Sequence, residues 1–243
     1  MKFIVKQLLK QALILNQLSG ELKIDRTQQA IHGDYSINIA FILAQRCDKS
    51  ASRLAQLVVS AIPAHPLITR VNADPSGFIN FFISDDARVE IIRLILEEDK
   101  PALTCEVTID PAGFDLDTIH YAYDRTNSIL AQCQANGLSA DRALGLANLA
   151  RLCLTQEQDL LNRLDDYLEI TTDAARHSTP DDIGNFLQQL AYALHTYLNR
   201  VPIACNEDDL RSARLCLLDA IRHVLCNGLV LLGFTSAESI KNG

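Results

Sequence analysis

One stretch near the end of the chain, residues 206–233, constrains the fold more than any other. Asn206 is a candidate N-cap, and the three carboxylates that follow it meet the positive end of the helix dipole. Apolar side chains then recur at steps of three and four residues, namely Leu210, Ala213, Leu217, Ala220 and Val224. Gly233 suits the position just past a helix end. The pattern predicts a long helix with one buried face.

The same stretch carries a motif that is shared with a known family. Asp219–Arg222 reads DAIR, with RSARL before it at Arg211–Leu215 and NGLVLLG after it at Asn227–Gly233. These segments resemble the C-terminal helix of the DALR anticodon-binding domain of arginyl-tRNA synthetases, which carries an Asp-Ala-Leu-Arg motif. The resemblance implies an all-α helical bundle that meets the anticodon stem-loop of a tRNA.

Charge is unevenly distributed along the 243 residues. Residues 1–88 hold ten Lys and Arg against seven Asp and Glu, a net of +3, and residues 89–243 hold twelve against twenty-three, a net of −11. A nonspecific RNA binder would carry a basic surface, because phosphate contacts supply most of that kind of affinity. The acidic second part therefore counts against RNA binding.

The cysteines and the first residues indicate the compartment. There are seven cysteines, an odd number without a CxxC pair, and most lie among apolar residues, so we expect reduced core thiols. Lys and Gln interrupt the apolar start, which is typical of an amphipathic helix rather than a signal peptide. We therefore expect a cytoplasmic protein without a membrane partner.

The first 98 residues predict a small α/β domain, and the whole chain predicts an α+β fold. Asp34 is expected to cap a helix, Ser50 to cap the next one, and Asp74–Gly77 to form a hairpin turn. The expected elements are, in order, a helix over 2–18, an extended segment over 22–32, helices over 35–46 and 50–62, antiparallel strands over 67–73 and 77–84, and a helix over 86–98.

Two segments of this domain resemble the additional N-terminal domain of arginyl-tRNA synthetases. They are GDYSINIA at Gly33–Ala40 and GFINF at Gly77–Phe81. The resemblance implies that the domain lies against the tRNA elbow and reads the D-loop, with Ser76, Phe78 and Asn80 in contact with RNA. An aromatic ring can stack on an unpaired base, and an amide can read a base edge. The alternative is that Phe78 belongs to the core of an ordinary strand.

Residues 99–115 contain two prolines, a glycine and no periodicity, so they predict a linker before a helical domain over 116–243. The synthetases hold a Rossmann-type catalytic domain at this place, for which there is no room here. Neither a His-x-Gly-His sequence nor a Lys-Met-Ser-Lys-like loop occurs. We therefore expect no enzymatic activity.

The helical domain is predicted to contain helices over 117–135, 156–177 and 180–200, the second opened by a capping box of Thr155 and Gln158. Residues 121–129 and 195–203 resemble further motifs of the anticodon-binding domain, with departures at Tyr123, Asp124 and Leu198. The resemblance implies that the following residues contact tRNA: Tyr121, Arg125, Tyr197, Asn199, Arg211, Arg214 and Arg222. Further basic contacts expected in the first domain are Arg26, Lys49 and Arg70.

Other chemistry finds little support in the sequence. The paired acids stand mostly at predicted helix starts, where the helix dipole explains them. His195 with Asn199, and Asp219 with His223, are i,i+4 pairs of a helix surface rather than metal ligands. Cys216 lies on the apolar stripe, so we expect a core thiol. No nucleotide-binding glycine motif or metal-ligand spacing occurs, and we expect no cofactor and no metal.

Two functions of different classes stay open. The first is a non-catalytic tRNA-binding protein, with arginine tRNA as the expected species, which serves a tRNA-modifying enzyme or a full-length synthetase as an adaptor. The second is a protein-interaction subunit that has kept the synthetase-derived folds and lost RNA binding. A degenerate or artificial deletion product of a synthetase is the third possibility.

Overall fold

The computed structural model describes residues 1–234 except 21, 28–29, 47, 85, 98–112, 139–140 and 175–179. The chain divides into two compact units, Met1–Ala87 and Arg88–Gly243. Most of the predicted linker, residues 99–115, falls outside the described residues, so the predicted domain boundaries stay predictions.

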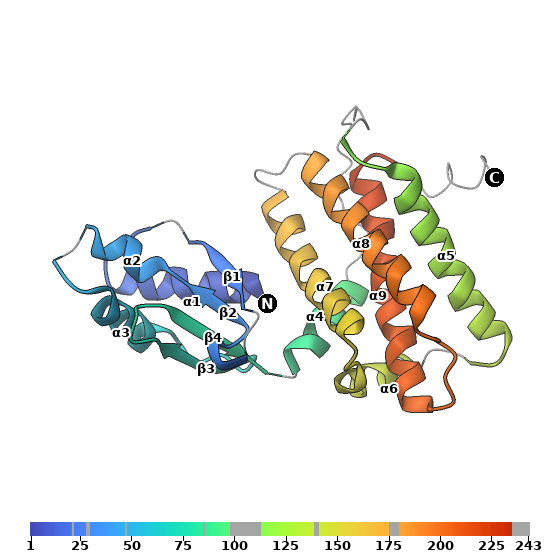
Figure 1. Cartoon of the computed structure of the whole chain (residues 1–243), viewed down its shortest axis with the longest axis horizontal. Helices are drawn as coiled ribbons and strands as arrows, with labels where there is room; N and C mark the ends of the chain where they lie inside the picture. Colours follow the sequence, from blue (N-terminus) through green and yellow to red (C-terminus); the bar gives the residue numbers. More distant parts are fainter. Residues whose placement is uncertain are drawn as a thin grey trace. The chain divides into compact units, whose positions relative to one another are not determined.

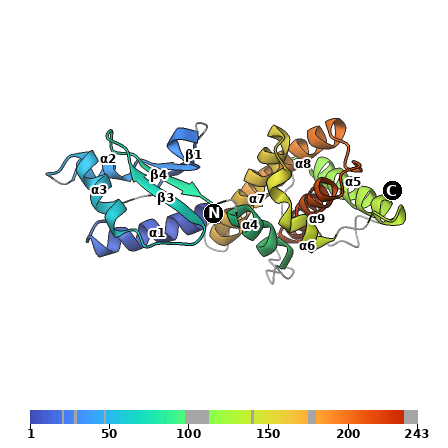
Figure 2. The ribbon, with the colours of Figure 1, turned by 90° about the horizontal axis from the view of Figure 1, so that it is seen from below.

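The first unit is a four-stranded antiparallel sheet, in the order β1-β2-β4-β3, with α1 and α3 packed on one of its faces (Figures 1 and 2). The following elements build it: α1 (Lys2–Leu15), β1 (Ile24–Arg26), a 3-10 turn (Ala30–His32), β2 (Tyr35–Ile37), α2 (Ile39–Ala44), α3 (Ala51–Ala61), β3 (Ile68–Ala73) and β4 (Ile79–Ile83). The hairpin of β3 and β4 was predicted, and its turn is closed by a hydrogen bond from the Asp74 amide to the Phe78 carbonyl, 2.7 Å.

The start of the second helix was predicted wrongly. Residues 35–37 form strand β2 rather than the first turn of a helix. The strand pairs with β4, and in this position the side chains of Tyr35 and Ile37 are both fully buried. Asp34 does not cap a helix; its Oδ2 accepts a hydrogen bond from the Ile83 amide, 2.9 Å. Ser50, in contrast, caps α3 as predicted, with its Oγ accepting from the Arg53 amide at 3.3 Å.

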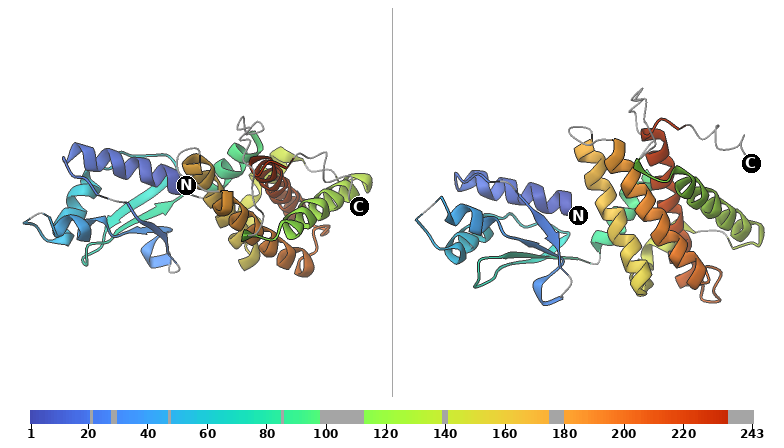
Figure 3. Two further views of the ribbon diagram at one scale, coloured as in Figure 1. Left: turned by 90° about the horizontal axis from the view of Figure 1, so that it is seen from above. Right: turned by 45° about the horizontal axis from the view of Figure 1, so that its top comes forward.

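The second unit is helical, which completes the predicted α+β fold. In Figures 1 and 3, α5, α7, α8 and α9 run beside one another, and α6 packs against α9. The helices are α4 (Asp86–Glu97), α5 (Leu116–Ala135), α6 (Arg142–Ala147), α7 (Thr155–Ala174), α8 (Pro180–Arg200) and α9 (Asp208–Leu231), with a 3-10 turn at Leu149–Arg151.

Helix α9 is the centre of this unit. Four of the five predicted stripe residues, Ala213, Leu217, Ala220 and Val224, have no exposed surface, whereas Leu210 is half-buried. Further residues around the helix are buried as well. The predicted end is also confirmed: Gly233 has a φ of +82°, and the amides of Gly233 and Phe234 donate to the carbonyls of Val230 and Leu229. Contacts with α5, α6, α7 and α8 explain why α9 is buried on more than one face.

Further helix starts differ from the sequence prediction. The N-cap position of α9 is Glu207 rather than the predicted Asn206, and no side chain caps the helix there. Helix α7 begins at Thr155 and is capped by Glu157, whose Oε2 accepts from the Leu154 amide at 3.0 Å, so the predicted Thr155–Gln158 box is wrong. Helix α6 was not predicted, although Asp141 is a good N-cap and accepts from the Leu144 amide at 3.0 Å. A helix of two turns gives too short a periodic signal.

Gly33 provides a test of the first unit. Its φ is +75°, and a Cβ at this position would lie 2.4 Å from the backbone oxygen of Phe81. The same oxygen accepts a hydrogen bond from the Asp34 amide, so it is not free to move away. Gly137 shares the φ of +75° but has nothing within 4 Å of its Cβ position. We expect Gly137→Ala to cost about 1–2 kcal/mol from backbone strain alone, and Gly33→Ala to cost more because β4 must move. Urea unfolding of both variants measures the difference, and equal losses would contradict it.

Candidate nucleic-acid interface

A pocket opens on the sheet of the first unit and brings three predicted site residues together. It has a volume of about 400 Å³, and we call it the sheet pocket. It is lined by Thr27, His32, Ser36, Asp74, Ser76, Phe78 and Asn80. Ser76, Phe78 and Asn80 were predicted to contact RNA. Thr27, His32 and Ser36 were missed, because only strand pairing brings residues so distant in sequence next to β4, and Asp74 had been predicted only as part of the hairpin turn.

The alternation of side chains along the strands builds the floor of the sheet pocket. Tyr35 and Ile37 on β2 lie opposite Phe81 and Ile79 on β4, and all four are fully buried. The intervening pair, Ser36 and Asn80, therefore points to the other face of the sheet.

Asn80 is held firmly within the sheet pocket. Its side chain is nearly buried, at 5% exposure, and its Oδ1 accepts a hydrogen bond from the Ser36 hydroxyl at 2.8 Å. This bond fixes the amide plane and occupies the acceptor. The amide nitrogen is consequently the part of Asn80 that can donate to a ligand.

Phe78 supplies an aromatic surface at the pocket edge. The residue precedes β4, and 40% of its surface is exposed. Phe41 of α2 packs edge-on against the ring, with the centroids 5.1 Å apart, and so holds its orientation. A half-exposed and fixed ring costs little to order when a base stacks on it. Phe78 is therefore not a core residue of an ordinary strand.

A second group of predicted residues meets on the helical unit, between α5 and α8. Arg125 places its Nη1 2.9 Å from His195 Nδ1 and donates through Nη2 to Asn199 Oδ1 at 2.8 Å. Tyr121, 57% exposed, lies one turn earlier on α5, with its ring centroid 6.1 Å from that of His195. We call these four residues the α5–α8 cluster. His195 had been interpreted as a plain surface neighbour of Asn199, and its contact with Arg125 required the tertiary structure.

Two other predicted residues lie where RNA cannot reach them. Tyr197 is fully buried, and its hydroxyl donates to Glu157 Oε1 at 3.2 Å. Arg214 is 7% exposed; its Nε donates to the same oxygen at 2.9 Å, and its Nη1 donates to the Pro202 carbonyl at 2.9 Å. The predicted contacts of Tyr197 and Arg214 with tRNA are therefore corrected: both residues hold the bundle together.

The environment of this buried group shifts two pKa values. Burial, followed by the charge of Glu157, raises the pKa of Tyr197, so the hydroxyl stays protonated and can donate. Burial is the largest single effect on Arg214 and would lower its pKa, but the hydrogen bond to Glu157 and the charges of the neighbouring groups together outweigh it and raise the pKa. The two groups thus remain a neutral donor and a cationic donor around one carboxylate.

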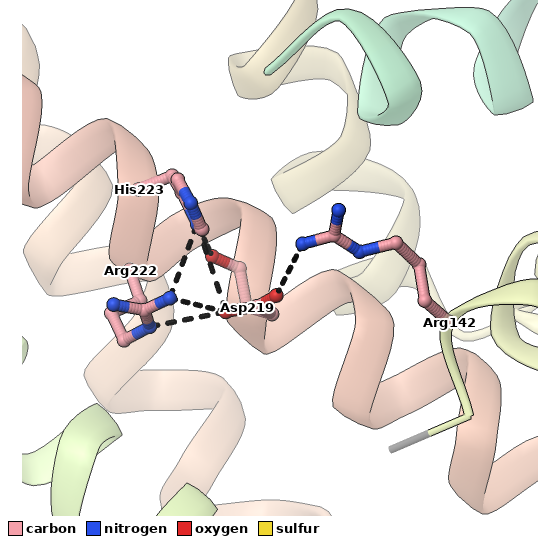
Figure 4. Close-up of polar contacts among 4 residues, drawn as sticks. All are labelled: Arg142, Asp219, Arg222 and His223. Carbon is pink, nitrogen blue, oxygen red and sulfur yellow. Dashed lines mark hydrogen bonds and ion pairs between the residues drawn. The ribbon is translucent and has the colours of Figure 1, made fainter. Parts of the chain in front are cut away.

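The remaining predicted arginines of α9 are engaged in ion pairs. Arg211 donates to Asp208 Oδ1 at 2.6 Å and to the Cys205 carbonyl at 2.8 Å. Arg222 donates to Asp219 Oδ1 through Nε at 3.1 Å and Nη2 at 2.7 Å (Figure 4). Both arginines are thus paired with carboxylates of their own helix, and their contacts with tRNA stay predictions.

The Asp219 carboxylate connects two helices. Besides Arg222, it accepts from Arg142 of α6, with Arg142 Nη2 3.4 Å from its Oδ2 (Figure 4). His223 Nδ1 lies 3.0 Å from the Asp219 carbonyl oxygen, which makes it the donor to that carbonyl. The motif at residues 219–222 therefore joins α6 to α9 and has a structural function.

The basic residues expected in the first unit have varied surroundings. Arg70 is exposed and lies over the Phe82 ring, 3.8 Å from its centroid, and Arg26 lies over the Tyr35 ring at 5.0 Å. Lys49 is exposed. None of the three lines the sheet pocket.

The described cysteines are all free, but they are less buried than predicted. Cys133 and Cys216 are buried, whereas Cys153 is exposed and Cys205 and Cys226 are intermediate. Burial raises the pKa of Cys216 to about 11, so its thiol is neutral at physiological pH, as expected for a core residue. Within the described ranges, no group of His, Cys, Asp and Glu could hold a metal ion, and no helix is long and apolar enough to cross a membrane.

The buried ion pair leads to a prediction about stability. Arg214→Ala should destabilise the helical unit by about 3–5 kcal/mol, because it leaves the Glu157 carboxylate buried without its charged partner. Arg163→Ala removes a partly exposed i,i+4 pair with Asp159 on α7 and should cost only about 0.3–0.5 kcal/mol. Urea unfolding followed by circular dichroism at a helix wavelength compares them. A similar small loss in both would refute the central role of Arg214.

Comparisons with known proteins match both units. Residues 119–240 match the family described as DALR anticodon binding domain, and residues 1–83 match the family described as Arginyl tRNA synthetase N terminal domain. Only residues 84–118 separate the two matches, so no catalytic domain lies between them.

Known relatives include full-length ligases. The chain is 39% identical over 122 residues to an arginine–tRNA ligase of Legionella pneumophila (strain Corby). These aligned residues make up 50% of this chain and 21% of the ligase. It is 36% identical over 148 residues to an arginine–tRNA ligase of Thioalkalivibrio sulfidiphilus, covering 56% of this chain and 25% of the ligase. The chain thus spans about a fifth to a quarter of these relatives.

Proposed function

The chain belongs to the DALR anticodon binding domain family, which matches half of it, and from this premise we propose that it is a non-catalytic tRNA-binding protein. Arginine tRNA is the expected species. The first unit would contact the elbow of the tRNA through the sheet pocket, and the helical unit would contact the anticodon stem-loop through the α5–α8 cluster. The bound tRNA would be presented to a separate tRNA-modifying enzyme or to a full-length synthetase.

The sheet pocket is the observation that carries this proposal. It combines a half-exposed ring, Phe78, with a fixed amide, Asn80, in a cavity of about 400 Å³. Stacking and edge recognition are the two interactions by which proteins bind unpaired bases, and the pocket offers both. A surface that had lost RNA binding would not need to hold Phe78 exposed.

The surroundings of Arg125 support the helical half of the proposal. Arg211, Arg214 and Arg222 all hold carboxylates, but the contacts of Arg125 are with the neutral amide of Asn199 and with His195. Arg125 Nη1 can only donate, so His195 Nδ1 is the acceptor, and neither of these two partners of Arg125 is a carboxylate. Arg125 therefore keeps its charge for a phosphate, and Tyr121 beside it exposes a ring.

A net charge of −11 over residues 89–243 does not decide against tRNA, because attraction depends on the local surface rather than on the sum. It does favour a second candidate, a protein-interaction subunit that no longer binds RNA. The engaged arginines of α9, and Leu198 in place of an aromatic residue of the family pattern, point the same way. Direct binding measurements separate the two candidates.

Salt dependence is the first test. If two phosphates are contacted, the affinity of the full chain for arginine tRNA should fall about tenfold when the salt concentration rises from about 50 to 200 mM. Fluorescence anisotropy with labelled arginine tRNA and a second tRNA species measures both affinity and selectivity. An absence of binding up to high micromolar protein would support the protein-interaction subunit instead.

The second test is Phe78→Ala, which should weaken tRNA binding by about tenfold through the loss of one stacked base. Phe3→Ala is a matched control, because Phe3 is 37% exposed, close to the 40% of Phe78, but lies on α1 outside the sheet pocket. Circular dichroism establishes that both variants fold. If both folded variants bind like the unmodified chain, Phe78 does not belong to the interface.

A further inference from the structure

The solvent-facing side of α1 carries a pattern that the packing of the first unit does not use. On its other side the helix buries five apolar side chains, namely Val5, Leu8, Leu9, Ala12 and Leu13. The solvent-facing side presents Phe3, Gln7, Lys10 and Ile14, all of them exposed. Phe3 is 37% and Ile14 74% exposed, although both side chains are large and apolar. We call these four residues the α1 stripe.

The spacing of the α1 stripe is that of a coiled-coil seam. Phe3, Gln7, Lys10 and Ile14 follow one another at steps of four, three and four residues, which keeps them in line along the helix. From Phe3 to Ile14 the stripe extends over roughly 16 Å, because each helical residue rises about 1.5 Å. A single exposed apolar side chain needs no explanation. Two of them at the ends of one seam indicate a face on which another helix packs.

The α1 stripe is complementary to itself when two copies of the helix meet in opposite directions. Residue 3 of one copy then faces residue 14 of the other, and residue 7 faces residue 10. Phe3 thus meets Ile14 at both ends of the pair, and in the middle each Lys10 ammonium can donate to the side-chain oxygen of a Gln7. A parallel pair would place Lys10 against Lys10, and the two charges would repel one another.

We infer that α1 is a dimerisation element, and that the α1 stripe of one copy packs against the α1 stripe of a second copy in an antiparallel pair. A second copy is the occupant because it supplies a matching group for each of the four residues, in the isologous arrangement of a two-fold dimer. The polar residues in the middle of the seam fix its register and direction. The contact is short, so the dimer is weak, with a dissociation constant on the order of 100 µM.

The dimer contact leaves the sheet pocket open. Helices α1 and α3 pack on one face of the sheet, whereas Ser36 and Asn80 point to the other face (Figure 2). The inference therefore goes beyond the proposed function and does not rest on it. Loss of dimerisation would leave the proposed tRNA contacts in place, and loss of tRNA binding would leave the dimer in place.

Sedimentation equilibrium of the full chain tests for the dimer. The protein concentration should range from about tenfold below to about tenfold above the expected dissociation constant. Over this range we expect the weight-average mass to rise from 26.9 kDa, the mass of one chain, towards twice that value. A mass that stays at that of one chain throughout overturns the inference.

Ile14→Lys tests the seam. The substitution places a charge opposite Phe3 at both ends of the pair and should weaken association at least about tenfold. Ile31→Lys is the matched control, because Ile31 is 77% exposed, close to the 74% of Ile14, and lies in the same unit outside α1. Circular dichroism establishes that both variants fold. Equal weakening in the two variants would mean that any exposed apolar side chain drives the association, which overturns the α1 stripe as the contact.

Gln7→Glu tests the direction of the pair. In the antiparallel arrangement the new carboxylate faces Lys10 of the second copy at two places, so association should strengthen about threefold. In a parallel arrangement two carboxylates would face each other, and association would weaken. Gln56→Glu adds the same charge at an exposed position of α3, outside the α1 stripe, and should leave association unchanged. Unchanged or weaker association of Gln7→Glu overturns the antiparallel pair.

Discussion

The helical unit depends on one buried carboxylate, that of Glu157. Its two oxygens accept from the Leu154 amide at the start of α7, from Tyr197 of α8 and from Arg214 of α9, and Arg214 also reaches the Pro202 carbonyl. A carboxylate without exposed surface is costly to bury unless it is fully paired, and this one has three donors. The group therefore sets how α7, α8 and α9 pack, and through α8 it positions the α5–α8 cluster.

Local patterns predicted the elements better than they predicted the partners of side chains. The stripe of α9, its glycine end and the Ser50 cap depend on neighbours within a few residues, so the sequence reveals them. Strand β2 was mistaken for a helix because Asp34 resembles an N-cap, while the strand itself is only three residues long. Glu157 was missed, because its pairing with Arg214 joins positions 57 residues apart.

In the candidate site, too, the sequence predicted neighbours within one hairpin but not residues that come together from distant segments. Ser76, Phe78 and Asn80 were predicted together because a single hairpin carries them, whereas Thr27, His32 and Ser36 join the sheet pocket only through strand pairing. The family resemblance indicated Arg211, Arg214 and Arg222 as RNA contacts, but their carboxylate partners become visible only in the folded chain. In the proposed function, the groups that meet RNA are a ring and an amide on the sheet and, on the bundle, Arg125 with Asn199 and His195 as its partners. Both surfaces occur without a catalytic domain between the two matched segments.

Hydroxyl-radical footprinting of arginine tRNA in the presence of the full chain tests this account most directly. The account predicts protection at two separate places, the D-loop at the elbow and the anticodon stem-loop, from one bound protein. Protection that is absent at saturating protein, or that is spread evenly along the tRNA, would contradict it.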